Sequence, residues 1–177
     1  MDGQYDHAHD IRRLGLEAAV IPTDDYLMKT GRLDAGYMAG WYNAADVYLN
    51  TSWAEGFGVP LIEAQACGLP AIGTDCSAVT ELVQPGIGWR VPSELKANPL
   101  QKRSWRAPWI KGIEQALTKA HAAWRAGTPG TGGVWQGRQQ RAREFADAYA
   151  VDVVWETYWR PLLKRCEGGD FKAEPAS

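Results

Sequence analysis

The sequence has little of what marks disulfide-rich, membrane-spanning or secreted proteins. Its 177 residues contain three cysteines, Cys67, Cys76 and Cys166, whose odd number and spacing fit neither a disulfide framework nor a zinc site. No apolar run approaches the roughly 20 residues of a membrane span, and the first residues lack the charge and apolar stretch of a signal peptide. We therefore expect a cytoplasmic protein with no membrane span and with reduced, mostly buried cysteines.

An excess of charge of one sign is also lacking. The chain has 19 Lys and Arg against 21 Asp and Glu, for a net charge of −2, and the basic residues are dispersed. A nucleic-acid partner would need a clustered basic face, so none is expected. His7 and His9 lie close to the N-terminus, where we interpret them as part of a tail, and no metal site is predicted.

The order of apolar segments indicates a single α/β domain, which 177 residues are enough to form. The expected strands are 18–21, 45–49, 71–74 and 89–91, and the expected helices are 10–14, 35–43, 59–67, 109–125, 136–149 and 152–165. This alternation predicts parallel βαβ units with a ligand site at the carboxyl ends of the strands. Residues 92–108 are interpreted as a loop and 127–133 as a flexible turn. Trp105 and Trp109 are expected to cover a core edge, and the alternative is that they stack on a bound sugar.

One stretch is hard to explain by packing alone. Glu55 and Glu63 lie eight positions apart, and a glycine-bracketed turn and a helix start separate them. Either glutamate alone has a structural explanation, as a solvated loop residue or as a residue placed for the helix dipole. Their occurrence together at a strand-to-helix crossing favours a binding site.

The backbone of this crossing predicts an anion site. Gly56 and Gly58 permit positive φ and a close approach by another group. The N–H groups of Gly58, Val59 and Leu61 would be unpaired at the helix start, which attracts phosphates above all. Carboxylates beside the anion would accept hydrogen bonds from hydroxyl groups. A ligand that combines phosphate with hydroxyls, such as a nucleotide sugar, fits this pattern.

These residues resemble the signature of a known family. Residues 55–63, E-G-F-G-V-P-L-I-E, resemble the E-x7-E element of the group 1 glycosyltransferases, which are retaining nucleotide-sugar enzymes of the GT-B fold. Residues 64–75 are similar to the helix, Gly-x-Pro turn and strand that follow it in the family, and the resemblance extends over about residues 10–165. It implies a Rossmann-like parallel sheet flanked by helices, the donor half of a GT-B enzyme, with extra C-terminal helices.

The resemblance also implies roles for the residues of the motif. Glu55 would be catalytic, contacting the hydroxyls of the transferred sugar, and Glu63 would bind the donor ribose. Backbone amides around Phe57 would hold the sugar and the diphosphate. The expected donor-binding residues are Gly56, Phe57, Gly58, Leu61, Ile62 and Glu63. The only ligands implied are a nucleoside diphosphate sugar and an acceptor that the motif does not specify, with no metal, because helix dipoles and basic side chains stabilise the diphosphate.

Two parts of the family pattern do not occur in this sequence. Family members have an N-terminal acceptor domain, and their donor domain opens with a G-R-x4-K-G-like loop that has no counterpart before Asp10. We therefore expect an N-terminally truncated donor-domain fragment that does not transfer sugar alone. The alternatives are a non-catalytic or split donor-binding subunit that needs an acceptor-domain partner, and a nucleotide-sugar epimerase of the same fold, which the Glu-Gly-Phe-Gly element disfavours.

The expected organisation is a mobile tail at 1–9, the Rossmann-like domain at 10–150, a closing helix at 151–167 and a disordered tail at 168–177. In the closing helix, spacings of four, three and four define an apolar stripe of Val151, Trp155, Tyr158 and Leu162. We interpret the stripe as packing on the domain's own sheet. The alternative is an exposed patch, formed by Trp155, Trp159 and Leu163, that favours self-association.

Overall fold

The computed structural model describes residues 6–23, 27, 29–31, 33–98, 103–127 and 133–168. The chain divides into two units, residues 1–38 and 39–177. The first unit contains α1, His7–Arg13, which begins before the expected Asp10 because the Asp6 side chain caps it, accepting a hydrogen bond from the His9 N–H at 2.9 Å.

The predicted strand at 18–21 is wrong. The N–H groups of Ala19 and Val20 both donate to the Leu16 C=O, at 2.9 and 3.0 Å, so this segment is a local turn. Ile21 is 79% exposed. The apolar residues that suggested a buried strand therefore do not lie in a sheet.

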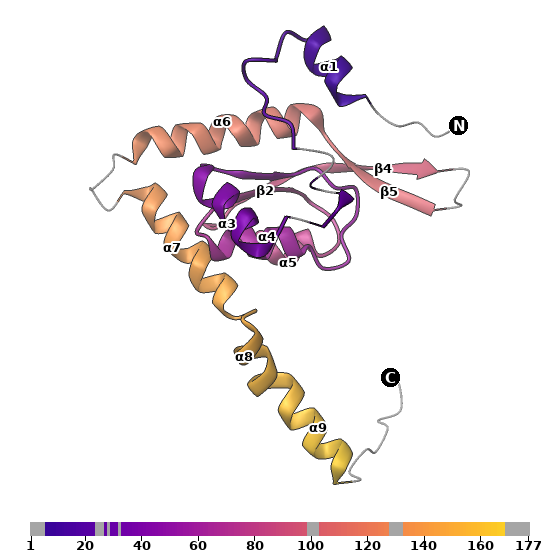
Figure 1. Ribbon diagram of the computed structural model, residues 1–177, viewed down its shortest axis with the longest axis vertical. Helices are drawn as coiled ribbons and strands as arrows, with labels where there is room; N and C mark the ends of the chain where they lie inside the picture. Colours follow the sequence, from indigo (N-terminus) through magenta and orange to yellow (C-terminus); the bar gives the residue numbers. More distant parts are fainter. Residues whose placement is uncertain are drawn as a thin grey trace. The chain divides into compact units, whose positions relative to one another are not determined.

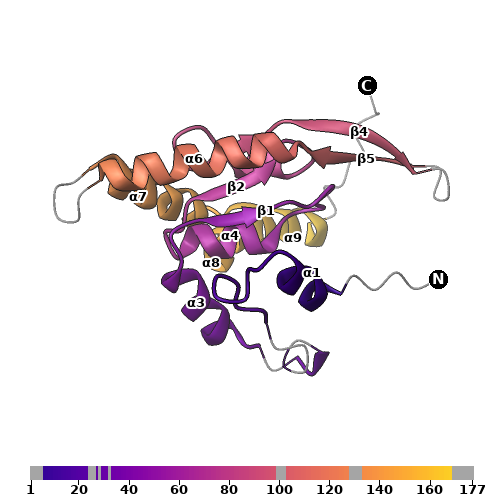
Figure 2. The same ribbon diagram turned by 90° about the horizontal axis from the view of Figure 1, so that it is seen from above.

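A three-stranded parallel sheet forms the centre of the second unit (Figures 1 and 2). Its strands, in the order β1-β2-β3, are β1 (Tyr48–Asn50), β2 (Ala71–Thr74) and β3 (Trp89–Val91). The helices around them are α3 (Ala35–Ala44), α4 (Val59–Ala66) and α5 (Val79–Leu82). Tyr48 pairs with Ala71, and Ile72 with Trp89. The predicted α/β fold with a parallel sheet flanked by helices is confirmed.

Both faces of the central strand β2 are buried. Successive side chains of a strand point to opposite faces. Ala71 accordingly packs with α4 and α5 residues, including Leu61 and Val79, while Ile72 packs on the other face with residues such as Ala116. The second face is covered by α6, Ile110–Ala126. All four residues of β2 are buried, as expected for a parallel sheet between helices.

The predicted loop at 92–108 is instead a β-hairpin. Strand β4, Ser93–Asn98, pairs antiparallel with β5, Arg103–Pro108, and Lys96 lies opposite Trp105. Backbone hydrogen bonds define these strands, and Leu95 is 63% exposed. The hairpin therefore lacks a continuous apolar face from which its strands could be predicted in the sequence. Trp109, expected to cover a core edge, is 54% exposed.

The C-terminal part is helical. Helix α7, Val134–Asp147, is followed by α8 (Val151–Val154), the π-helical turn η1 (Trp155–Trp159) and α9 (Arg160–Glu167). The π turn has a local cause, because Pro161 has no N–H to donate to the carbonyl four residues earlier, and the Arg160 N–H bonds to the Trp155 C=O instead.

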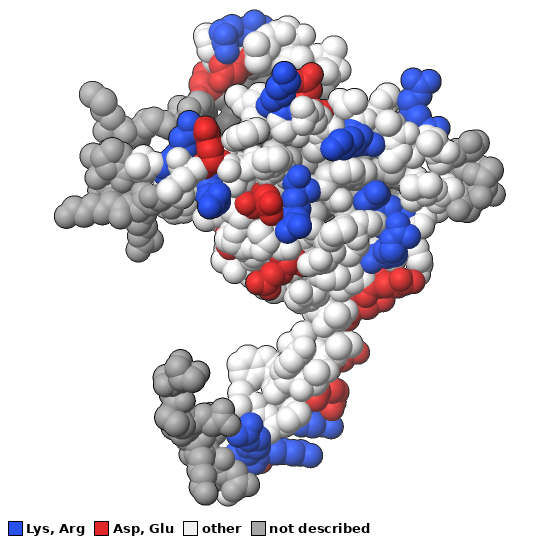
Figure 3. All heavy atoms as spheres, turned by 180° about the vertical axis from the view of Figure 1, so that it is seen from behind, with Lys and Arg blue, Asp and Glu red and all other residues white. Residues whose placement is uncertain are grey.

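The apolar stripe of this C-terminal segment is exposed. Val151 is 85%, Trp155 45% and Tyr158 66% exposed, so the prediction that the stripe packs on the domain's own sheet is wrong. In Figure 3 the charged side chains of the segment gather on one side and uncharged ones cover the other. Self-association through this surface stays a prediction.

Two further observations concern the described residues only. Every helix among them is too short or too polar to cross a membrane. The three cysteines there are free. Cys76 is buried and Cys67 partly buried, whereas Cys166 is exposed, so the expectation of a buried cysteine is wrong for Cys166.

Candidate functional site

The loop after β1 holds Glu55 by its side chain. Asn50, the last residue of β1, is only 6% exposed, and its Nδ2 donates to Glu55 Oε1 at 3.1 Å. The Asn50 Oδ1 accepts from the Ser52 N–H at 2.8 Å. Because a buried amide seldom gives up its hydrogen bonds, Asn50 fixes both the loop and the Glu55 carboxylate.

The loop after β2 holds Glu55 by its backbone. The Glu55 N–H donates to Ser77 Oγ at 2.9 Å, across 22 positions of sequence. Ser77 has a φ of 45°, in the left-handed region that non-glycine residues seldom occupy. The carboxyl ends of the adjacent parallel strands β1 and β2 thus meet at Glu55, as the alternating pattern predicts.

The start of α4 has two backbone amides to offer a ligand. Gly58 has a φ of 88°, and a Cβ there would lie 3.1 and 3.2 Å from the Leu61 and Leu82 side chains, so this position requires glycine. The Leu61 N–H donates to the Gly58 C=O at 2.9 Å, so the prediction that it is unpaired is wrong. Among the described residues, the N–H groups of Gly58 and Val59 have no acceptor.

Glu63 is exposed on α4 and is held by a tyrosine of α3. The Tyr42 O–H donates to Glu63 Oε2 at 3.1 Å, and Tyr42 is itself buried, with its ring edge-on to Tyr48 at 5.9 Å. Burial, and then the hydrogen bond and charge of Glu63, raise the pKa of Tyr42. Burial and the charges of Glu55 and Glu63 raise the pKa of Tyr48. Tyr48 thus lies within the fields of both carboxylates.

The raised pKa of Tyr42 predicts a loss of stability at high pH. Above about pH 10 the phenol of the unfolded chain loses its proton while the folded chain keeps it. The free energy of unfolding should therefore fall as pH rises past about 10, by up to about 1.4 kcal/mol per pH unit for this one group. Tyr42→Phe should fall less steeply, which urea unfolding at a series of pH values measures.

Tyr158→Phe is the control, because Tyr158 is 66% exposed. Its unfolding free energy should follow the same pH dependence as the unsubstituted chain. If Tyr42→Phe also follows that dependence, burial and the Glu63 contact do not raise the pKa of Tyr42 in the folded chain.

The other residues of the motif lie around the same helix start. Phe57 is 47% exposed, and its ring lies edge-on to Tyr149 at 5.7 Å, so its side chain packs toward the end of α7. Leu61 is fully buried, and Ile62 packs against the same core cluster. Gly56 is exposed and has open space at its Cβ position. Their parts in donor binding stay predictions.

Sequence reasoning missed three side chains that hold the glutamates, namely Asn50, Ser77 and Tyr42. Asn50 and Ser77 could have been found from topology, because polar residues just after adjacent parallel strands converge on one edge of the sheet. Tyr42 had no such signal, since its partner lies 21 positions away on another helix. Within the described residues, no three His, Cys, Asp or Glu side chains are grouped as metal ligands.

Comparisons with known proteins identify the family to which this sequence is similar. Residues 6–101, more than half of the chain, match the model of glycosyl transferases group 1. A D-inositol 3-phosphate glycosyltransferase of Kribbella flavida is 36% identical over 87 residues, which are 49% of this chain and 19% of that protein. The O-antigen chain mannosyltransferase B of Escherichia coli is 32% identical over 82 residues, 42% of this chain and 22% of that protein. The chain thus spans less than a quarter of these curated relatives.

A solved structure shares the fold. The sucrose-phosphate synthase from Thermosynechococcus elongatus superposes with a TM-score of 0.60 and 21% identity, over 89% of this chain and 33% of that one. The region matched by the family model includes the whole parallel sheet and both glutamates at the start of α4. The chain belongs to the group 1 glycosyltransferases.

Proposed function

We propose that this chain forms the donor-binding part of a retaining sugar transferase and binds a nucleoside diphosphate sugar. The observation that carries the proposal is the arrangement at the start of α4, where two carboxylates flank a helix start with two backbone amides available. The amides would bind the diphosphate of the donor, and the two carboxylates would bind the hydroxyl groups of its sugar and its ribose. The transfer reaction and its acceptor belong to the proposal as well.

The diphosphate would bind at the helix start. The amides of Gly58 and Val59 point out of a helix whose N-cap has no side-chain hydrogen bond. A helix start concentrates partial positive charge on such groups and stabilises a bound phosphate. The left-handed glycine at position 58 lets the phosphate approach the backbone without a side chain in the way.

The two glutamates would bind the hydroxyl-bearing ends of the donor. Glu55 is fixed by Asn50 and Ser77, so it can hold a sugar hydroxyl without first losing conformational freedom. Glu63 keeps one oxygen on Tyr42 and can accept from ribose hydroxyls with the other. Charge-assisted hydrogen bonds of this kind are about twice as strong as neutral ones.

Calorimetry against uridine, guanosine and adenosine diphosphates and their sugars tests the proposal. We expect at least one diphosphate to bind at millimolar concentration, and its sugar conjugate to bind more tightly. Glu55→Ala should weaken binding of the sugar conjugate by about tenfold or more and leave binding of the bare diphosphate unchanged, because Glu55 contacts only the sugar. Failure of every ligand to bind would contradict the proposed donor site, and an equal loss for the diphosphate and its sugar would contradict the role of Glu55.

A further inference from the structure

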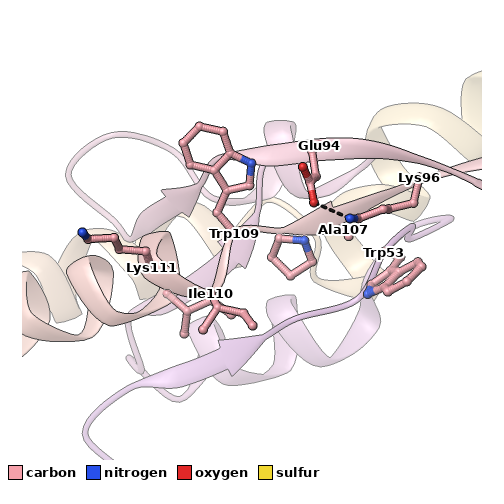
Figure 4. Close-up of a pocket in the computed structure, with 9 residues that line it drawn as sticks. Trp53, Glu94, Lys96, Ala107, Trp109, Ile110 and Lys111 are labelled. Atoms are coloured by element: carbon pink, nitrogen blue, oxygen red, sulfur yellow. Dashed lines mark ion pairs between the residues drawn. The ribbon is translucent and has the colours of Figure 1, made fainter.

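A pocket of about 550 Å³ lies at the base of the β4–β5 hairpin (Figure 4). Its walls come from the loop after β1, from the hairpin and from the first turn of α6, and they include Trp53, Glu94, Lys96, Ala107, Trp109 and Ile110. The described residues that line this pocket do not include Glu55 or Glu63. Its volume falls in the range of about 300–1,000 Å³ that is typical of small-molecule sites.

Two half-exposed tryptophans line this pocket. Trp53 is 49% and Trp109 is 54% exposed, although burial of an indole stabilises a folded chain. A pyranose ring presents a face of C–H groups that packs against an indole, and carries its hydroxyls around the rim. Exposed indoles on the walls of one pocket are therefore suited to a sugar ring.

An ion pair supplies polar groups between the tryptophans. Glu94 and Lys96 project from the same face of β4, and the Lys96 Nζ lies 2.6 Å from Glu94 Oε1. In Figure 4 this pair lies between Trp109 and Trp53. Both side chains are half exposed, so they can accept a hydrogen bond from one hydroxyl and donate one to its neighbour.

Backbone hydrogen bonds hold the walls together. The Arg106 N–H of β5 donates to the Trp53 C=O at 3.2 Å, and the Trp109 N–H donates to the Pro92 C=O at 2.9 Å. The hairpin is thus tied to the loop that carries Glu55, and the turn into α6 is tied to the hairpin. A site with fixed walls loses less entropy when a ligand binds.

We propose that this pocket is a carbohydrate subsite that binds a pyranose ring between Trp53 and Trp109. The inference goes beyond the proposed function, because the residues described as lining this pocket do not include the two glutamates of the donor site. Trp53 lies two positions before Glu55, so the loop that would hold the donor sugar is also a wall of the pocket. A sugar bound there would lie along the edge of the donor site.

Saturation-transfer NMR and calorimetry test the pocket directly. The probes are the methyl pyranosides of glucose, galactose, mannose and N-acetylglucosamine, together with their disaccharides, added to the full chain. We expect at least one probe to bind, and Trp53→Ala or Trp109→Ala to weaken its binding by about tenfold, because the C–H face of the sugar loses the apolar surface of an indole. The matched control is Trp159→Ala, which removes an indole of 53% exposure in η1 and should leave binding unchanged.

Nucleoside diphosphate binding by the unsubstituted chain is measured beside the glycosides. If a diphosphate binds and no glycoside does, the subsite is wrong and the donor-site proposal stands. If glycosides bind and no diphosphate does, the subsite stands as a sugar site and the proposed function is wrong. Glycoside binding that survives both pocket substitutions, or that Trp159→Ala weakens equally, overturns the subsite.

Discussion

Gly88→Ala is expected to destabilise the fold by about 3 kcal/mol, the upper end of the usual cost of overpacking. Gly88 immediately precedes β3, where the chain passes close to β2. A Cβ at this position would overlap the Ala71 carbonyl oxygen and would lie 2.8 Å from Val83 Cγ1. Since Ala71 is part of the central strand, the backbone of the sheet would have to move, which chemical denaturation would report as a lower free energy of unfolding.

Gly40→Ala is the matched control for this prediction. Gly40 lies inside α3, and a Cβ there would meet nothing within 4 Å. Alanine in a helix interior is favoured over glycine by about 0.5–1 kcal/mol, so this variant should be slightly more stable than the unsubstituted chain. Equal stability of the two variants would mean that the approach of Gly88 to β2 is not a constraint on the fold.

The sheet could be predicted from sequence where its strands are buried. Strands β2 and β3 occupy the predicted residues, 71–74 and 89–91. All four residues of β2 are buried, as is typical of a strand covered on both faces, whereas only Val91 is buried in β3. The start of α4 at Val59 was also predicted, since Pro60 fits the first turn of a helix and good helix formers follow it. Strand β1 begins three residues later than expected, because Ala45 and Asp46 are exposed and outside the ladder.

The remaining errors have one physical cause. Hydrophobic pattern reports burial, and it fails where a segment is ordered by backbone hydrogen bonds or where an apolar surface is left exposed. The hairpin at 93–108 is ordered without an apolar face, and the helical stripe from Val151 to Leu162 is apolar without being buried. At the candidate site, spacing alone placed the glutamates at the start of α4, but the contacts of Tyr42 and Ser77 cross more than 20 positions of sequence.

Glu63→Ala is expected to weaken nucleoside diphosphate binding by about 1.5–3 kcal/mol, or roughly 10- to 100-fold. The carboxylate would accept hydrogen bonds from ribose hydroxyls, and an alanine leaves those hydroxyls without a charged acceptor at the edge of the site. Because Glu63 is exposed and lies outside the core clusters, the fold should persist, with a lower free energy of unfolding because the Tyr42 O–H loses its acceptor. Calorimetry with the diphosphate that binds the unsubstituted chain measures the loss, and the urea unfolding curve checks the fold.

Two further variants separate ribose binding from a general effect of charge. Glu81→Ala removes an exposed glutamate from the first turn of α5 and should leave diphosphate affinity unchanged. Tyr42→Phe keeps the Glu63 charge but removes the O–H that donates to Oε2, so it should weaken binding by less than Glu63→Ala does. If Glu63→Ala instead tightens diphosphate binding, the carboxylate repels the phosphates more than it holds the ribose, and Glu63 is not the ribose ligand.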